Sequence, residues 1–230
     1  MFRILVVCTA NICRSPATAT LLRRELAPLV STSMVEITSA GVAADPGRAA
    51  CDLSSALVGQ FVARQHPGEP AAAPDPDAHV ARRVTVEMVD QADLILALDR
   101  SHRSQLARVS AAARPRTFTL RQAAGLSQVI DGYLSNGELP PGAPELPPQP
   151  EAALRWWVAE LDAARGTPVG ANETNEAMQW HEDDVPDPHV MGYQIHGAAI
   201  ALAEAAVLIL SSGMGRVVAE STEETTSDRT

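Results

Sequence analysis

Short apolar runs and amphipathic segments alternate along the first 120 residues of the chain. The apolar runs are rich in β-branched residues and too short for helices, which is typical of strands buried on both faces of a sheet. Strands are expected at 2–8, 34–38, 92–98 and 115–120. Helices are expected at 17–29, at 52–64, at 86–91 and directly after Ser101, a suitable N-cap residue. This alternation predicts an α/β sandwich with a parallel sheet.

The second half of the chain departs from this pattern. Residues 131–150 hold a Pro- and Gly-rich stretch that can form neither a helix nor an interior strand. An amphipathic helix is expected at 151–165 and a long one, with an apolar stripe, at 193–210. The polar, acidic residues 213–230 are expected to form a disordered tail. We therefore expect one domain, residues 1–212, with an inserted segment at about 131–180.

Charge and cysteine content narrow the class of protein. The 28 acidic residues outnumber the 18 basic ones, and no basic run occurs, which argues against binding to nucleic acid. Three cysteines are too few for a disulfide framework, so a reducing cytoplasm is expected. The longest apolar stretch, 197–210, is interrupted by Glu204 and is shorter than the roughly 20 residues of a membrane span. We therefore predict neither a membrane span nor secretion.

Cys8 and Arg14 stand at a point where the expected fold would place a ligand. Cys8 ends the first expected strand, and Arg14 and Ser15 open the helix that follows. In parallel α/β sheets, ligands bind beyond the carboxyl ends of the strands. Backbone N–H groups of residues 9–14 can curl around one phosphate, and the helix N-terminus adds positive potential. Asn11 tolerates the left-handed backbone that such a tight loop needs.

The side chains of this loop suit chemistry at phosphorus. The planar guanidinium of Arg14 can bind two phosphate oxygens side by side. The positive potential of the loop favours the thiolate of Cys8, and the Ser15 hydroxyl can donate to that sulfur. A thiolate held in this way is a good nucleophile toward a phosphoric ester.

The same reaction needs a proton donor for the leaving oxygen, and Asp187 is the candidate. It lies between Pro186 and Pro188, just before the long helix, so its backbone is restricted. The acidic residues at 182–184 are the alternatives.

Three histidines near this loop, His181, His189 and His196, raise the question of a metal. Their scattered spacing and loop setting favour solvated polar side chains over metal ligands. The sequence therefore predicts no metal site and no cofactor.

The segment FRILVVCTANICRSPATATLL resembles the start of the low-molecular-weight protein tyrosine phosphatases, whose signature is V-C-x-G-N-x-C-R-S-P. Residues 38–41 resemble the family's S-A-G segment, and 79–85 and 92–99 resemble two further stretches. The Val-Pro-Asp-Pro at 185–188 matches the family's D-P acid loop. The resemblance covers residues 1–125 and 182–210 and includes two separate active-site motifs in the family's order.

This resemblance implies a three-layer α/β sandwich around a four-stranded parallel sheet, with a phosphate-binding loop after the first strand. It implies that Cys8 is the nucleophile of a cysteinyl-phosphate mechanism that uses no metal. Arg14 would bind the phosphate, and Asp187 would be the general acid.

The resemblance also implies supporting roles. Ser15 would stabilise the thiolate, and Asn11 and Ser39 would brace the loop. Cys13 stands where the family has a second cysteine that can pair with the nucleophile during reversible oxidation. The implied phosphate-binding residues are Thr9, Ala10, Asn11, Ile12, Cys13, Arg14 and Ser15.

Several positions depart from the family pattern. Ala10 replaces a Gly of the signature, and its methyl group would crowd the loop if the backbone there were strained. The loop after Gly41 lacks the aromatic residue that usually walls the cleft, and His189 stands where Tyr or Trp is usual. Ile12 favours phosphotyrosine, since relatives selective for phosphoarginine tend to have Thr there.

The inserted segment at about 131–180 carries every tryptophan of the chain: Trp156, Trp157 and Trp180. We hypothesise that one of them replaces the missing cleft wall. Because Trp156 and Trp157 are adjacent, a helix would point them about 100° apart, one onto the core and the other toward a cleft or an interface.

The leading interpretation is a cytoplasmic phosphatase acting on phosphotyrosine proteins or small aryl phosphates. One alternative is a catalytically impaired member of the fold that only binds phosphorylated partners, which Ala10 and the missing aromatics favour. An arsenate reductase is another alternative, but its relay of cysteines would have to be built from Cys13 and Cys51 alone.

Overall fold

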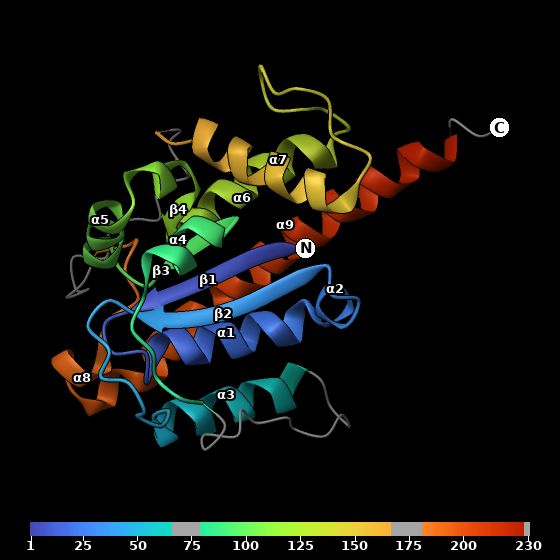
Figure 1. Ribbon diagram of the computed structural model, residues 1–230. Coiled ribbons are helices and arrows are strands. Elements are labelled where there is room, and N and C mark those ends of the chain that lie inside the picture. Colours follow the sequence, from blue (N-terminus) through green and yellow to red (C-terminus); the bar gives the residue numbers. More distant parts are fainter. Residues whose placement is uncertain (66–78, 167–180, 228–230) are drawn as a thin grey trace.

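Four parallel strands form the centre of the computed structural model, which describes residues 1–65, 79–166 and 181–227 (Figure 1). The strands are β1 (Phe2–Cys8), β2 (Val35–Gly41), β3 (Leu94–Ala97) and β4 (Thr117–Thr119). They pair in the order β2-β1-β3-β4. The register places Cys8 beside Gly41 and Val7 beside Ala97, so the ends of three strands meet at one edge. The predicted four-stranded parallel sheet is confirmed.

Helices connect and cover the strands. The helices of the first half are α1 (Arg14–Glu25), α2 (Ala27–Ser31), α3 (Asp52–Gln65), α4 (Val86–Gln91) and α5 (Arg100–Val109). A 3₁₀ helix η1 (Ala111–Arg116) follows, and then come α6 (Leu120–Ser135), α7 (Pro150–Ala163), α8 (Pro188–Met191), η2 (Tyr193–Ile195) and α9 (His196–Ser227). The sequence did not predict α6, which begins directly after β4 with Thr119 as its N-cap.

Alternation along β1 divides the core between the two faces of the sheet. Phe2, Ile4 and Val6 pack in one cluster with residues of α1, α3, α6, α7 and α9. Leu5 and Val7 point to the opposite face and pack with residues of α4, α5 and η1. Figure 1 shows the sheet between these two groups of helices. The predicted three-layer sandwich is therefore confirmed.

Helix α9 corrects the predicted tail. It runs to Ser227, whereas the sequence indicated an irregular tail from residue 213. The apolar stripe continues past Leu210 through Met214 and Val217, both of which are fully buried. Gly213 lets α9 approach α6 closely, because an added Cβ would lie 2.3 Å from the Ser127 hydroxyl oxygen.

Together, η2 and most of α9 form the segment from Tyr193 to Thr222, which is long enough to cross a membrane and whose most apolar window has a mean hydropathy of 1.7. This segment is longer than the 14-residue apolar stretch at 197–210 judged from the sequence. In the fold, 44% of its most apolar window is buried, and the helix packs against α1, α6 and α7. The apolar stripe of α9 is therefore explained by its packing against these three helices.

The inserted segment joins the core. Helix α7 packs against α6 and α9, with Trp157 fully buried. Trp156 is only 6% exposed, and its indole N–H donates to the Pro144 carbonyl at 2.9 Å. Neither tryptophan walls a cleft, so for both of them that hypothesis is wrong. Trp180 lies beyond the residues that the structure describes.

Candidate active site

The loop between β1 and α1 is built around Asn11. Its φ of 56° is left-handed, as the sequence predicted. The Asn11 side-chain amide donates to the hydroxyls of Ser15 and Ser39, each at 3.0 Å. In return, the Asn11 side-chain oxygen accepts from the Arg82 backbone N–H at 3.0 Å. These bonds hold the loop against β2 and bring together the three residues that the resemblance implied as supports.

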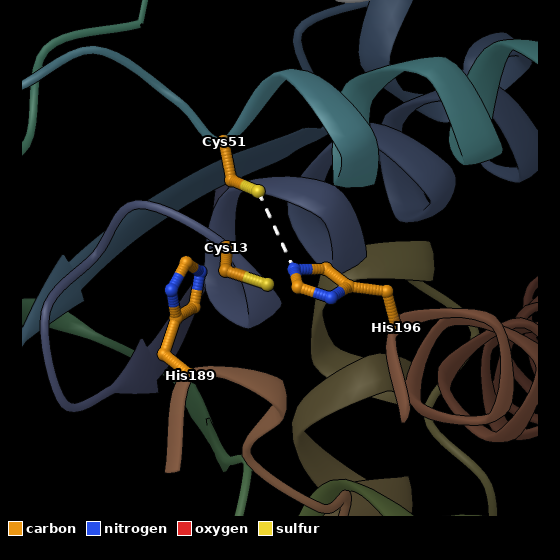
Figure 2. Close-up of side chains that lie close together, drawn as sticks. All are labelled: Cys13, Cys51, His189 and His196. Carbon is orange, nitrogen blue, oxygen red and sulfur yellow. Dashed lines mark hydrogen bonds between the residues drawn. The ribbon is translucent and has the colours of Figure 1, made fainter. Parts of the chain in front are cut away.

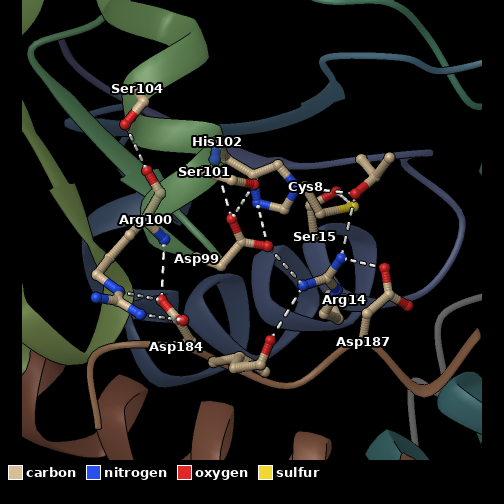
Figure 3. Close-up of polar contacts among 12 residues, drawn as sticks. Cys8, Arg14, Ser15, Asp99, Arg100, Ser101, His102, Ser104, Asp184 and Asp187 are labelled. Carbon is tan, nitrogen blue, oxygen red and sulfur yellow. Dashed lines mark hydrogen bonds and ion pairs between the residues drawn. The ribbon is translucent and has the colours of Figure 1, made fainter. Parts of the chain in front are cut away.

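Cys8 lies at the last position of β1 and is 3% exposed. Its sulfur is 3.0 Å from the Ser15 hydroxyl oxygen (Figure 3). The same sulfur accepts from the Asn11 backbone N–H at 3.3 Å. Both groups can donate to a thiolate, which is the form of cysteine that attacks phosphorus.

Arg14 begins α1 and is 3% exposed, and both terminal nitrogens of its guanidinium have hydrogen-bond partners. One terminal nitrogen donates to the Asp99 carboxylate at 3.1 Å and to the Val185 carbonyl at 3.0 Å. The other donates to the Thr9 hydroxyl at 3.3 Å and to the Asp187 carboxylate. The guanidinium is thereby fixed beside the loop, as bidentate recognition of an oxyanion requires.

Asp187 is brought to this loop from the far end of the chain. It is the N-cap of α8, and one of its oxygens accepts from the His189 backbone N–H at 3.0 Å. The other oxygen contacts Arg14, and the side chain is 21% exposed. Among its acidic neighbours, Asp184 instead pairs with Arg100, whose backbone N–H lies 2.9 Å from the carboxylate.

Asp99 is a site residue that the sequence analysis missed. It follows β3 and caps α5 by accepting from the His102 backbone N–H at 2.9 Å, so the predicted cap at Ser101 is wrong. Ser101 donates its hydroxyl to the same carboxylate at 2.6 Å. Burial tends to raise the pKa of Asp99, but His102, Ser101 and Arg14 outweigh it and hold that pKa below its usual value. Asp99 directly follows a predicted strand, at the edge of the sheet where ligands bind, and this position could have identified it from the sequence.

His102 was also missed. It is 1% exposed, and its Nε2 lies 2.8 Å from the Thr9 hydroxyl. Its Nδ1 is 3.1 Å from an Asp99 oxygen, but the geometry there is not that of a hydrogen bond. Burial, helped by Arg14, lowers the pKa of His102 to about 4 despite Asp99. A neutral imidazole therefore orients Thr9, which in turn contacts Arg14.

The remaining residues of the loop are partly or fully buried. Thr9 and Ala10 are partly buried, and Ile12 and Cys13 are buried against Ala81. Within the described ranges, the non-glycine residues with positive φ are Asn11 and Ser33. Ala10 therefore has ordinary backbone geometry, and its methyl group does not strain the loop.

Cys13 differs in character from Cys8. Its sulfur is 2.8 Å from the Ser54 hydroxyl oxygen, and burial raises the pKa of its thiol to about 12. At neutral pH Cys13 is therefore a thiol and does not compete with Cys8 as nucleophile. Its redox role remains a prediction. It lies in a cluster with Cys51, His189 and His196 (Figure 2).

A pocket of about 440 Å³ opens over Arg14. Its lining residues are Thr9, Arg14, Asp99, Arg100, Ser101, Asp184, Val185, Pro186, Asp187, Val190 and Met191. No aromatic side chain is among them, as the departures from the family signature suggested. Its apolar lining residues are Val185 and Pro186, which precede Asp187, and Val190 and Met191 of α8.

The sequence is similar to known phosphatases over its first half. Residues 3–131 match the model of the family described as low molecular weight phosphotyrosine protein phosphatase. Over 137 residues, the chain is 32% identical to the low molecular weight protein-tyrosine-phosphatase Etp of Escherichia coli K12, covering 56% of this chain and 76% of Etp. It is 35% identical over 121 residues to the protein-arginine-phosphatase of Geobacillus stearothermophilus, covering 53% of this chain and 70% of that protein.

Solved structures share the fold. Vibrio vulnificus Wzb, solved with benzylphosphonate, aligns over 92% of this chain and 97% of its own, with a TM-score of 0.54 and 19% identity. The YwlE arginine phosphatase of Geobacillus stearothermophilus aligns over 100% and 99% of the two chains, with a TM-score of 0.52 and 21% identity. At this identity the structural likeness concerns the fold, and membership rests on the sequence match. The family match over more than half of the chain, on the fold that carries the Cys8–Ser15 loop, shows that this chain belongs to the low molecular weight phosphotyrosine protein phosphatase family.

Proposed function

We propose that this protein hydrolyses phosphoric monoesters of the phosphotyrosine or aryl phosphate class through a cysteinyl-phosphate intermediate. The observation that carries the proposal is the convergence of Cys8, Arg14 and Asp187 on one loop at the carboxyl edge of the sheet. The mechanism uses a free Cys8 thiol, and all three cysteines are free, so we also propose a reducing, cytoplasmic location.

The first half-reaction is phosphoryl transfer to sulfur. The Cys8 thiolate attacks phosphorus in line with the bond to the leaving oxygen, while loop N–H groups and Arg14 hold the equatorial oxygens. Asp187, protonated at this stage, gives its proton to the leaving oxygen as the P–O bond breaks. The products are the free alcohol or phenol and phosphocysteine.

The second half-reaction releases phosphate. Asp187, now a carboxylate, takes a proton from water as that water attacks the phosphocysteine. The P–S bond breaks and returns the Cys8 thiolate, which Ser15 and the Asn11 N–H group stabilise. Inorganic phosphate then leaves from Arg14.

A phosphoarginine substrate is the second candidate, and one feature of the pocket favours it. Carboxylates of Asp99, Asp184 and Asp187 line the pocket and would attract a guanidinium group. Against this, Asp99 and Asp184 are engaged by Arg14 and Arg100. Ile12, which favoured an aryl ester in the sequence, is buried against Ala81 and is not among the lining residues of the pocket.

The test is hydrolysis of p-nitrophenyl phosphate by the purified full chain with a thiol reductant. Wild type is expected to turn over and Cys8→Ser to be inactive. Asp187→Ala should be slowed at least about tenfold, less than the 10²–10⁴ expected for a leaving group that needs a proton. Asp183→Ala is the matched control, because Asp183 is an acidic residue of the same loop. Its kcat should stay within about threefold of the wild-type value, since the proposed mechanism gives Asp183 no part in the reaction.

Substrate class and the rival functions are tested with the same proteins. If phosphate is released faster from a phosphotyrosine peptide than from a matched phosphoarginine peptide, the aryl ester is the favoured substrate class. A folded wild type that binds phosphopeptide without turnover would make the protein a binding module. Arsenate-dependent consumption of thiol would instead indicate a reductase.

A further inference from the structure

Four side chains with metal-binding atoms converge beside the phosphate loop (Figure 2). One ligand atom from each of Cys13, Cys51, His189 and His196 lies within 4.8 Å of the others. They come from four separate places in the fold: the loop before α1, the residue before α3, α8, and the first turn of α9. Figure 2 shows the sulfurs of Cys13 and Cys51 facing the His196 imidazole, with the His189 imidazole on the other side of Cys13.

The distances suit a tetrahedral cation. The Cys51 sulfur lies 3.5 Å from Nε2 of His196. With Zn–S near 2.3 Å and Zn–N near 2.0 Å, tetrahedral angles place such a pair of atoms about 3.5 Å apart. The widest separation in the cluster, at most 4.8 Å, requires a closure of about 1 Å, which side-chain rotation can supply.

His196 is already oriented as a ligand. Its Nδ1 lies 2.8 Å from the Tyr193 carbonyl oxygen, which can only accept, so Nδ1 carries the proton. Nε2 then carries the free lone pair that can bind a cation, and this atom lies beside the Cys51 sulfur. A backbone carbonyl that fixes the tautomer of an imidazole in this way is the usual outer support of a metal-ligating histidine.

The four residues of the cluster differ in burial, so one side of the site is closed by the fold and the other is open to solvent. Cys13 and His196 are buried, Cys51 is half-buried, and His189 is exposed. An incoming ion would meet His189 first and reach the buried pair behind it. Two cysteine sulfurs, whose protons the cation displaces on binding, and two imidazoles form the donor set that prefers Zn²⁺ over the oxygen-seeking Mg²⁺ and Ca²⁺.

We propose that Cys13, Cys51, His189 and His196 bind one Zn²⁺ in a structural site that ties the acid loop to the phosphate loop. Cys13 immediately precedes Arg14, and His189 lies two residues after Asp187. The ion would therefore fix the separation of Arg14 and Asp187 without touching substrate. It also gives a reason for His189 at the usual aromatic position, and it assigns Cys13 a role other than pairing with Cys8.

The test is Co²⁺ binding to the Cys8→Ser protein, stripped of metal and kept reduced with a phosphine. This background removes the catalytic thiolate as a competing ligand and makes the readout independent of turnover. We expect one Co²⁺ per chain, with intense tetrahedral d–d bands and a sulfur-to-cobalt charge-transfer band, both abolished by added Zn²⁺. Removal of Cys51 (C51S) or of His189 (H189A) should weaken binding at least about tenfold.

His181→Ala is the matched control, an exposed histidine of the same loop outside the cluster. It should bind Co²⁺ as the Cys8→Ser parent does. Thermal unfolding of each variant verifies the fold, and Zn²⁺ should raise the midpoint of the parent but not of Cys51→Ser.

Three outcomes would overturn the proposal: weak octahedral bands, no bound ion, or binding that survives both Cys51→Ser and His189→Ala. None of these outcomes bears on p-nitrophenyl phosphate hydrolysis by wild type, so failure here and failure of the proposed function are distinguishable.

Discussion

Arg14 and Asp187 are joined by an ion pair although 173 positions separate them in the sequence. The same guanidinium also contacts Asp99. A bound phosphate would compete with the Asp187 carboxylate for the N–H donors of this guanidinium. The pair therefore links binding of a phosphate group to the position of the side chain proposed as the acid.

We expect Asp187→Asn to slow hydrolysis in a way that depends on the leaving group. Asn keeps an oxygen for the His189 N–H group but has no proton to give. For phenyl phosphate, whose leaving group needs protonation, kcat should fall about 10²–10⁴-fold. For p-nitrophenyl phosphate, which releases a stabilised phenolate, the fall should be much smaller. The measurement is kcat for both esters, and equal losses would contradict the role of Asp187 as acid.

Replacement of Arg14 by Lys tests the planar guanidinium itself. Lys keeps the positive charge but cannot make two parallel hydrogen bonds to a phosphoryl group. We expect kcat/KM to fall about 10²–10³-fold, with tight binding of inorganic phosphate lost as well. Arg103→Lys is the control, because Arg103 donates to Gln122 and neither residue is among the lining residues of the pocket. A value for Arg14→Lys close to that of this control would argue against bidentate binding.

Gly41 ends β2 directly beneath the phosphate loop. An added Cβ would lie 2.5 Å from the Thr9 carbonyl oxygen and 2.9 Å from the Asn11 backbone nitrogen, and neither atom can move without moving the loop. We expect Gly41→Ala to lower both kcat and the midpoint of thermal unfolding. Gly132→Ala, on α6 with open space around it, should instead be neutral or stabilising by about 0.5–1 kcal/mol. Full activity in Gly41→Ala would mean that the loop tolerates displacement.

A substitution at Ala10 tests whether this residue impairs catalysis. Because its φ is not positive, Gly at this position would relieve no strain and would add flexibility to the unfolded chain. We expect Ala10→Gly to leave kcat/KM within about threefold of wild type and to lower the free energy of unfolding slightly, by about 0.5–1 kcal/mol. A large gain in kcat would show that the methyl group does restrain catalysis.

Local features of the sequence were enough to find the loop and the candidate acid. Cys8, Arg14 and Ser15 follow one another across a strand–helix junction, and Asp187 is marked by the prolines on both sides. The alternation of apolar runs and amphipathic segments gave the sheet and its layers. Helix α6 was missed because it directly follows β4 without the turn residues that normally separate two elements.

Contacts between distant segments could not be predicted in the same way. Asp99 and His102 reach Arg14 and Thr9 only because β3 lies next to β1. The cluster at Cys13 joins positions 13, 51, 189 and 196, whose spacing follows no metal-binding motif. Burial against α6 and α7 also overrides the polar composition after residue 213, which suggested a tail.

His102 makes the stability of the fold depend on pH. Its pKa is about 4 in the folded protein and near 6.5 in an unfolded chain, so between these values the unfolded state binds more protons. The stabilisation is complete above about pH 6.5 and is lost as the pH falls toward 4. Between pH 7 and pH 5 the loss should be about 2 kcal/mol.

Urea unfolding followed by tryptophan fluorescence measures this loss, because Trp156 and Trp157 are buried reporters. His102→Gln removes the titrating group but can still bond Thr9, so its loss between the two pH values should be smaller than that of wild type by about 2 kcal/mol. His181→Gln, at an exposed loop position, should behave like wild type. If wild type and His102→Gln lose the same free energy of unfolding, His102 titrates normally in the folded protein and does not hold Thr9 as a neutral imidazole.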